Sequence, residues 1–169
     1  MSFDESFLAE LVQTLAAAKV QAIFIGNAAA VLQGIPVMTH DVDLMVREHP
    51  QLEKKLQKFS ELFGVTLSRP YEPSSRMLRA SGRSIGVDFV FALSSRKSFE
   101  SIRSRAKRIR IGNRMVLVAS LEDVIAAKEA ANRPKDKATL PILREALETR
   151  NSLARYKNNN QQRRTRDAH

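Results

Sequence analysis

Apolar residues near the start of the chain recur every three to four positions, which is the spacing of one face of a helix. The residues that follow this spacing are Phe7, Leu8, Leu11, Val12 and Leu15. Ser2 and Glu5 have the spacing of a capping box, in which two side chains bond to the backbone of the first turn. The pattern therefore predicts a helix from about Ser2 to Ala18.

Further along the chain, short apolar runs alternate with helical periodicity. The short runs predict strands over residues 20–25, 42–46, 76–80, 85–93, 106–111 and 114–118. Helical periodicity predicts helices over 28–33, 50–63 and 120–132, and a last helix that contains Leu140, Leu143 and Leu147 and admits Pro141 only in its first turn. This order indicates an α/β or α+β fold, with a mixed sheet flanked by helices and with helices at the C-terminal end. We place this domain at residues 1–150 and expect a basic, disordered tail over 151–169, where no apolar periodicity remains.

Composition narrows the class of protein. A chain of 169 residues fits one domain with its own core. The absence of cysteine excludes disulfides, a thiolate metal site and a cysteine nucleophile, and it favours a reducing compartment. Asp4 and Glu5 stand where a signal peptide needs positive charge, and no apolar run is long enough to span a bilayer. The sequence thus predicts a soluble, cytoplasmic protein with no membrane partner.

Positive charge is concentrated in two segments rather than spread along the chain, whose formal net charge is +10. Residues 95–114 hold eight Lys and Arg against a single Glu, and residues 151–169 hold five against a single Asp. Clustered cations attract phosphate polyanions, so a nucleic acid or a nucleotide is one expected partner. The alternative is that these side chains only keep an edge strand soluble.

Two carboxylates lie on one face of the second predicted strand. Asp41 and Asp43 alternate with apolar residues, which puts their Cα atoms roughly 6–7 Å apart along the strand. Their repulsion requires that one of them binds a proton or that a cation sits between them, unless solvent at the strand end screens both. An oxygen-only ligand set of this kind is typical of Mg²⁺, with Mn²⁺ as the alternative.

A third carboxylate and an inward-facing lysine add to this pattern. Asp88 interrupts the apolar run of a predicted central strand and shares a face with Gly86, which leaves room beside it. It belongs to a site, accepts a backbone hydrogen bond, or pairs with an arginine such as Arg79 on the neighbouring strand. Lys128 ends the inward stripe of its helix and either meets an acidic site or a phosphate, or extends to the surface along its aliphatic stem.

These residues together resemble a known family. The segment IFIGNAAAVLQGIPVMTHDVDLMV is similar to the opening motif of the DNA polymerase beta-like nucleotidyltransferases, in particular the small bacterial members found among abortive-infection and toxin–antitoxin proteins. Gly26, Asp41, Asp43 and Asp88 match the family pattern in order and approximate spacing. The later segment SLEDVIAAKEAANRPKDKATLPIL resembles the family's helix–helix segment, with Lys128, Arg133 and Asp136 at matching positions.

The resemblance implies a metal-dependent transfer of a nucleotidyl group. It assigns Asp41, Asp43 and Asp88 to divalent metal and adds Lys128 to these as a catalytic group. Gly26, Asn27, Thr39 and Arg133 would lie near the nucleoside triphosphate. Asp88 would complete a second metal position and help to deprotonate the acceptor, which the resemblance leaves as an RNA such as tRNA or a protein hydroxyl.

Two positions depart from the family pattern. Asn27 replaces a small residue and is expected to cap the next helix, and Met38 replaces a basic residue that often precedes Thr39. These departures favour a second reading, in which the fold is kept as a non-catalytic RNA-binding module. A third reading is a toxin–antitoxin component with an antitoxin as its partner.

Overall fold

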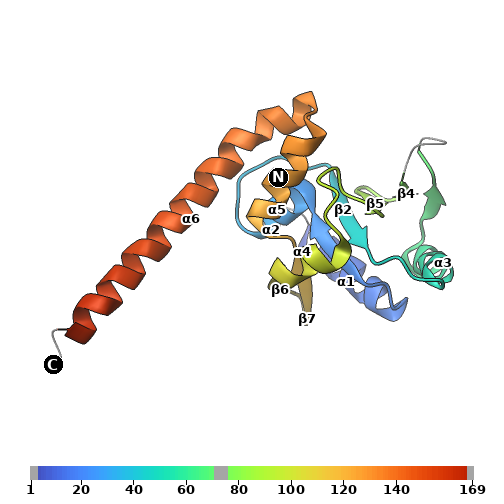
Figure 1. The fold of residues 1–169 in the computed structure, drawn as a ribbon. Coiled ribbons are helices and arrows are strands. Elements are labelled where there is room, and N and C mark those ends of the chain that lie inside the picture. The colour runs from blue at the N-terminus through green and yellow to red at the C-terminus, as the bar shows by residue number, and fades with distance from the viewer. Residues whose placement is uncertain (1–3, 71–75, 167–169) are drawn as a thin grey trace.

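The fold is a mixed seven-stranded sheet packed between helices (Figure 1). The computed structural model describes residues 4–70 and 76–166. Its strands are β1 (Ala22–Ile25), β2 (Asp41–Val46), β3 (Thr66–Ser68), β4 (Met77–Ser81), β5 (Gly86–Val90), β6 (Lys107–Ile111) and β7 (Arg114–Val118). Its helices are α1 (Glu5–Ala17), α2 (Gly26–Leu32), α3 (Leu52–Phe63), α4 (Phe99–Arg105), α5 (Leu121–Ala131) and α6 (Pro134–Arg166).

The sheet has the strand order β3-β4-β5-β2-β1-β7-β6. The pairs β2–β5 and β1–β7 are parallel, and the other four pairs are antiparallel. This confirms the mixed sheet that the sequence predicts. Strand β2, which carries two of the candidate carboxylates, lies at the centre of the sheet.

Helices α1 and α3 cover one face of the sheet through aromatic contacts. The ring of Phe59 in α3 meets Phe89 of β5 edge to face, and Phe63 meets Phe7 of α1. Because side chains alternate along a strand, Asp88 next to Phe89 points to the opposite face. Helices α2 and α5 pack against each other away from α1 and α3 (Figure 1).

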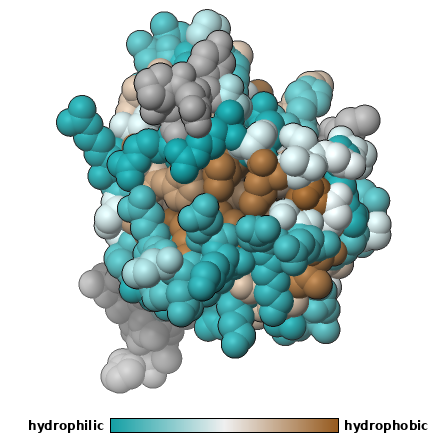
Figure 2. All heavy atoms as spheres, turned by 90° about the vertical axis from the view of Figure 1, so that its right-hand side faces the viewer, coloured by the Kyte–Doolittle hydropathy of each residue, from teal (hydrophilic) through white to brown (hydrophobic). Residues whose placement is uncertain are grey.

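The outer strands close the core less completely than the central ones. Figure 2 shows the side with α3, β3 and β4, where an apolar area is surrounded by hydrophilic side chains. Leu67 of β3 and Leu78 of β4 are only partly buried against the core, whereas Val87 and Phe89 of β5 are fully buried. The sheet is therefore more open over β3 and β4 than at its centre.

Most predicted elements are confirmed, with differences at their ends. The first helix is capped by Asp4, whose side chain accepts from the backbone N–H of Ser6, while Ser2 lies outside the described residues. Ser120 caps α5, and Asn132 ends it in the left-handed conformation. The hairpin of β6 and β7 forms at the predicted turn. Strand β3 and helix α4 were not predicted, since each is short and lacks a clear apolar period.

The last helix differs from the prediction in both its start and its end. It begins at Pro134, so Pro141 lies inside it rather than in its first turn. It also continues to Arg166, where we expected a disordered tail from residue 151. Extending a helix needs far less free energy than starting one, so the packed part around Leu140 and Leu143 can propagate into a polar segment. The outer half projects away from the body (Figure 1).

In the part of the chain that the structure covers, no helix combines the length and the apolar character needed to cross a bilayer.

Candidate active site

A single row of side chains crosses four strands on the face opposite Phe89. Asp43 of β2 is the register partner of Ile25 in β1 and of Asp88 in β5, and Asp88 is the partner of Arg79 in β4. Register partners share a face, and neighbouring strands lie about 4.8 Å apart. The sheet thus brings Asp43 and Asp88 together, although 45 positions separate them in the sequence.

Two glycines provide the space for the carboxylates of β2. A Cβ atom on Gly26 would lie 2.7 Å from Oδ2 of Asp43, and one on Gly86 would lie 3.0 Å from Oδ1 of Asp41. Gly26 also has a φ of +61°, which side chains rarely adopt. The room that the sequence predicts beside Gly86 is therefore used by Asp41 rather than by Asp88.

The electrostatics of the row centre on Asp43. Burial, with the neighbouring carboxylates of Asp88 and Asp41, raises the pKa of Asp43 to about 6. Lys135 and Arg133 lower it, so both cations at the start of α6 act on this carboxylate. The ionised form of Asp43 is thus destabilised by its surroundings, and a bound cation would stabilise it.

Asp88 is held by Arg79. Arg79 donates from Nε to Oδ1 at 2.8 Å and from Nη2 to Oδ2 at 2.7 Å. This two-point hydrogen bond raises the pKa of the guanidinium. Of the explanations that the sequence leaves open for Asp88, the structure contains the arginine pair, and it places that pair beside Asp43.

Lys128 meets an acid, but not one of the three carboxylates. Its Nζ donates to Oδ1 of Asp136 at 3.3 Å, and Nε of Arg133 donates to Oδ2 of Asp136 at 2.6 Å. Burial opposes ionisation of Asp136, but the hydrogen bonds from Arg133 and Lys128 outweigh it, and the pKa is lowered. Lys128 thus fixes the corner between α5 and α6, from which Arg133 and Lys135 approach Asp43.

Asn27 does not cap a helix as predicted. Helix α2 begins one residue earlier, at Gly26, and the side-chain amide of Asn27 donates to the carbonyl of Met38 at 2.8 Å. This bond ties α2 to the loop before β2, where Thr39 donates to the carbonyl of Asp41. Oδ1 of Asn27 is buried and has no hydrogen-bond partner among the described residues. Met38 is 66% exposed and contributes no charge.

The residues fit a divalent ion at Asp41 and Asp43 better than at all three carboxylates. Both are hard oxygen donors on one strand face, and the two glycines leave their oxygens uncovered by a neighbouring Cβ. Within the described residues, no group of three or more His, Cys, Asp or Glu side chains is placed to hold a metal ion. The predicted three-carboxylate metal set stays a prediction: Asp41, Asp43 and Asp88 share one sheet face, and both oxygens of Asp88 accept hydrogen bonds from Arg79.

One residue near the site was missed and another was underestimated. Lys135 lowers the pKa of Asp43 and lies among polar residues in the first turn of α6. In the sequence, only its position next to Asp136, which matches the family pattern, could have indicated that it lies near the site. The sequence predicts Arg79 only as a structural partner of Asp88. Its strand position opposite Asp88 is what gives it a place in the row.

Comparison with known structures supports the same fold. A protein from Thermotoga maritima, assigned as a nucleotidyltransferase, aligns with a TM-score of 0.57 and 19% identity, over 85% of this chain and 92% of its own. The antibiotic-resistance factor ANT(2″)-Ia, in complex with adenylyl-2″-tobramycin, aligns with a TM-score of 0.60 and 14% identity, over 85% of this chain and 88% of its own. No curated protein matches the chain.

The sequence profile of one family covers almost the whole chain. It is described as nucleotidyl transferase of unknown function (DUF2204), and it matches residues 5–165. A match of this length includes the carboxylate row, the α5–α6 corner and most of the projecting helix. The chain belongs to this family of nucleotidyl transferases and is a transferase enzyme.

Proposed function

We propose that this enzyme transfers an NMP group from a nucleoside triphosphate to a hydroxyl group of an RNA, with Mg²⁺ as its metal. The observation that carries the proposal is the juxtaposition of Asp41, Asp43 and Asp88 on one sheet face, with Arg133 and Lys135 acting on the same site. Acids for a metal and cations for phosphate are the two requirements of phosphoryl-type transfer, which depends on positioning and electrostatics.

Each group has a separate part in this proposal. Asp41 and Asp43 hold the ion, which when bound supplies charge stabilisation at the triphosphate. Arg133 and Lys135 attract the phosphates, and Gly26, Asn27 and Thr39 shape the loop that borders them. The acceptor hydroxyl loses its proton to water as its oxygen bonds to the α-phosphorus, while the bond to the pyrophosphate oxygen breaks and pyrophosphate leaves. Lys128 positions Arg133 through Asp136 and does not touch the substrate.

An RNA acceptor is supported by the basic edge of the sheet. Strand β6 is an edge strand, and Lys107, Arg108 and Arg110 on it are exposed. Arg108 is the register partner of Leu117, which pairs with Ile23 and through it with Met45, so it shares the face of Asp43 and lies three strands from β2. At about 4.8 Å per strand, the separation across these strands is roughly 14 Å. A polyanion bound along β6 would thus reach the carboxylates.

A labelling experiment tests the transfer. The protein is incubated with Mg²⁺, total RNA or cell lysate, and each of the four α-labelled nucleoside triphosphates in turn. We expect label in ribonuclease-sensitive material with one triphosphate and none with the Asp41→Ala/Asp43→Ala double variant. The matched control is Glu53→Ala/Glu61→Ala, which removes two exposed acids from α3 and should keep the activity.

The outcomes separate the parts of the proposal. Label in protease-sensitive material would replace RNA by a protein hydroxyl as acceptor. Label that persists in the Asp41/Asp43 double variant, or no label with any triphosphate, would contradict the proposed transfer.

The basic edge is tested by the salt dependence of RNA binding. Arg108→Ala/Arg110→Ala should reduce the slope of log K against log salt by about 2, since each lost phosphate contact removes nearly one released counterion. Lys54→Ala/Lys58→Ala removes the same charge from exposed positions on α3 and should leave the slope unchanged. Equal slopes for the two double variants would exclude β6 as the RNA contact.

An antitoxin partner is the part of the proposal that rests on family resemblance alone. Size-exclusion chromatography with the product of the neighbouring gene tests it. We expect the two proteins to elute as one complex, and separate elution at micromolar concentration would count against it.

A further inference from the structure

An ion pair stands where a second metal ion would need ligands. Both oxygens of Asp88 accept hydrogen bonds from Arg79, at 2.8 and 2.7 Å. The side chain of Asp88 is 6% exposed, so little of it is open to another ligand. The side chain of Arg79 is 43% exposed and reaches this position from the open part of the sheet. In the proposed transfer, a metal between Asp43 and Asp88 would have to displace this guanidinium.

Strand pairing places Arg79 directly opposite Asp88. Arg79 lies in β4, which pairs with β5 on one side and with β3 on the other, so its backbone is held by two ladders. It stands directly opposite Asp88 in the register, and the two side chains share a face. A bidentate arginine–carboxylate pair of this kind is specific in geometry as well as strong. Neither residue depends on a loop for its placement.

The charges of the row also favour one divalent ion over two. Asp41, Asp43 and Asp88 carry three negative charges when ionised, and Arg79 carries one positive charge, which leaves −2. One divalent ion neutralises this charge. A second ion would leave the row with a net charge of +2 unless Arg79 moved away.

We propose that Arg79 takes the place of a second metal ion, so that the enzyme binds one divalent ion per chain, at Asp41 and Asp43. This inference rests on the proposed function, because it presupposes a metal at these two residues. In this inference the guanidinium of Arg79 supplies the positive charge at Asp88 that a second metal ion would otherwise supply.

Binding of Mn²⁺ to the full chain, followed by electron paramagnetic resonance, tests the inference without measuring activity. The loss of the free Mn²⁺ signal gives the number of ions bound. Two ions in one site, about 3.5–4 Å apart, give a coupled spectrum instead of the six lines of a single ion. We expect one bound ion and an uncoupled spectrum for the unmodified protein.

Variants of Arg79 then show whether this side chain excludes the second ion. Arg79→Met keeps much of the stem without the charge, and we expect two ions and a coupled spectrum. Arg79→Lys keeps the charge and should bind one ion. The matched control is Arg76→Met. Arg76 lies just before β4, is exposed and pairs with Glu48, so this variant should also bind one ion. Circular dichroism verifies that each variant is folded.

Two results would overturn the inference alone. Two ions bound by the unmodified protein would mean that Arg79 excludes none, and this measurement holds even if Arg79→Met fails to fold. One ion in folded Arg79→Met would mean that another feature sets the number. No bound ion in the unmodified protein would instead contradict the proposed function, and with it this inference.

Discussion

Asp43 and Asp88 are register partners on adjacent parallel strands, and their carboxylates share one face of the sheet. Burial, with this neighbour and Asp41, raises the pKa of Asp43 from 3.8 to about 6. A raised pKa means that the folded protein holds the proton more tightly than the unfolded chain. The stability from this group is therefore complete below pH 4 and is lost as the pH rises through 6.

Asp43→Asn should remove this loss in the metal-free protein. A shift of about two pKa units corresponds to roughly 3 kcal/mol at most, so we expect the free energy of unfolding to rise by about 2 kcal/mol at pH 7. At pH 4 the gain should be much smaller. Urea unfolding with a chelator present measures both values. Glu61→Gln, an exposed acid on α3, is the control and should show no such pH dependence. A gain that is equal at both pH values would contradict the assignment.

Gly26→Ala should disturb the site more than its backbone strain explains. The new Cβ would lie 2.7 Å from Oδ2 of Asp43, at a φ of +61°. Gly34→Ala is a matched control, because Gly34 has a φ of +81° and no atom within 4 Å of the new Cβ. Each variant should lose about 1–2 kcal/mol of stability from the left-handed conformation. Only Gly26→Ala should also weaken Mg²⁺ binding, by tenfold or more, as measured by calorimetry.

Asp136→Asn should destabilise the corner between α5 and α6. Its carboxylate is fully buried and accepts from Lys128 and Arg133, so the substitution leaves the buried ammonium of Lys128 without its counter-charge. Breaking one side of a buried pair typically costs about 3–5 kcal/mol, and we expect a loss near the lower end because Arg133 is largely exposed.

A second ion pair between the same two helices provides the control for Asp136. Glu129 of α5 accepts from Arg144 of α6, and both side chains are about half exposed. Glu129→Gln should therefore change the free energy of unfolding by less than about 1 kcal/mol. Equal losses for Asp136→Asn and Glu129→Gln in urea unfolding would show that burial does not strengthen the inner pair.

Truncation after Arg150 should leave the rest of the protein folded. Residues 151–159 are exposed, whereas Arg150 still donates to the side chain and carbonyl of Gln33. We expect the midpoint of thermal unfolding to change by less than about 2 °C, with a loss of helical signal in circular dichroism. Truncation after Lys137 removes the buried Leu140 and Leu143 and should unfold or strongly destabilise the chain. A large loss of stability in the longer chain would assign the projecting half a structural role.

The sequence predicts the strand-borne part of the site well. The alternation around Asp41 and Asp43 identifies their common face, and the apolar run around Asp88 identifies a central strand. Period-two alternation is a local property, so it survives folding unchanged. The family resemblance adds that these strands lie near each other, which the sheet register confirms.

The sequence does not determine which of several possible partners each charged side chain of the site binds. The sequence leaves several environments open for Asp88 and for Lys128, and the choice among them depends on register and helix packing rather than on spacing. Arg79 stands opposite Asp88 because of how β4 pairs, and Asp136 reaches Lys128 because α6 folds back on α5. The length of α6 was underestimated for a related reason, since a polar segment continues a helix only when earlier turns are already packed.

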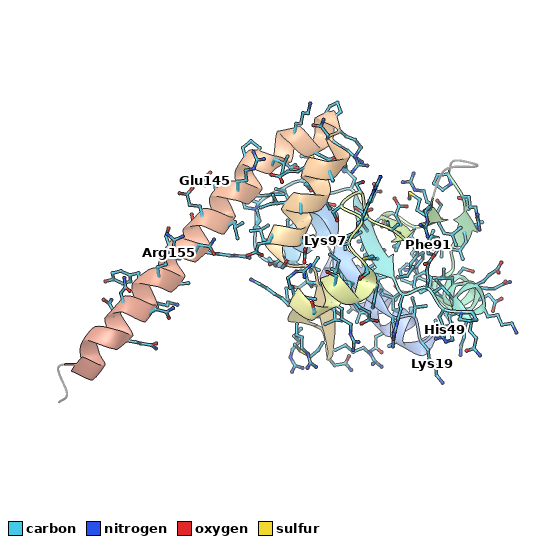
Figure 3. All side chains as sticks on the ribbon, in the orientation of Figure 1. Lys19, His49, Phe91, Lys97, Glu145 and Arg155 are labelled. Atoms are coloured by element: carbon cyan, nitrogen blue, oxygen red, sulfur yellow. The ribbon has the colours of Figure 1, made fainter. Side chains whose placement is uncertain are left out.

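The side chains labelled in Figure 3 illustrate the same limit. Glu145 and Arg155 lie along the projecting helix, while Lys97 lies near the body, where it donates to the buried Asp123. Charge alone does not distinguish a solvated lysine from one that anchors a loop. Arg105 also donates to Asp123. Some of the positive side chains of residues 95–114 therefore form ion pairs within the protein.

The pairing of Arg79 with Asp88 has a consequence for the folding of the chain. A carboxylate that already has a counter-charge from its own chain needs no bound ion to be tolerated inside the fold. Asp88 therefore adds no cation dependence to the stability of the fold. Any such dependence should come from Asp43, whose pKa is raised by burial and by its acidic neighbours.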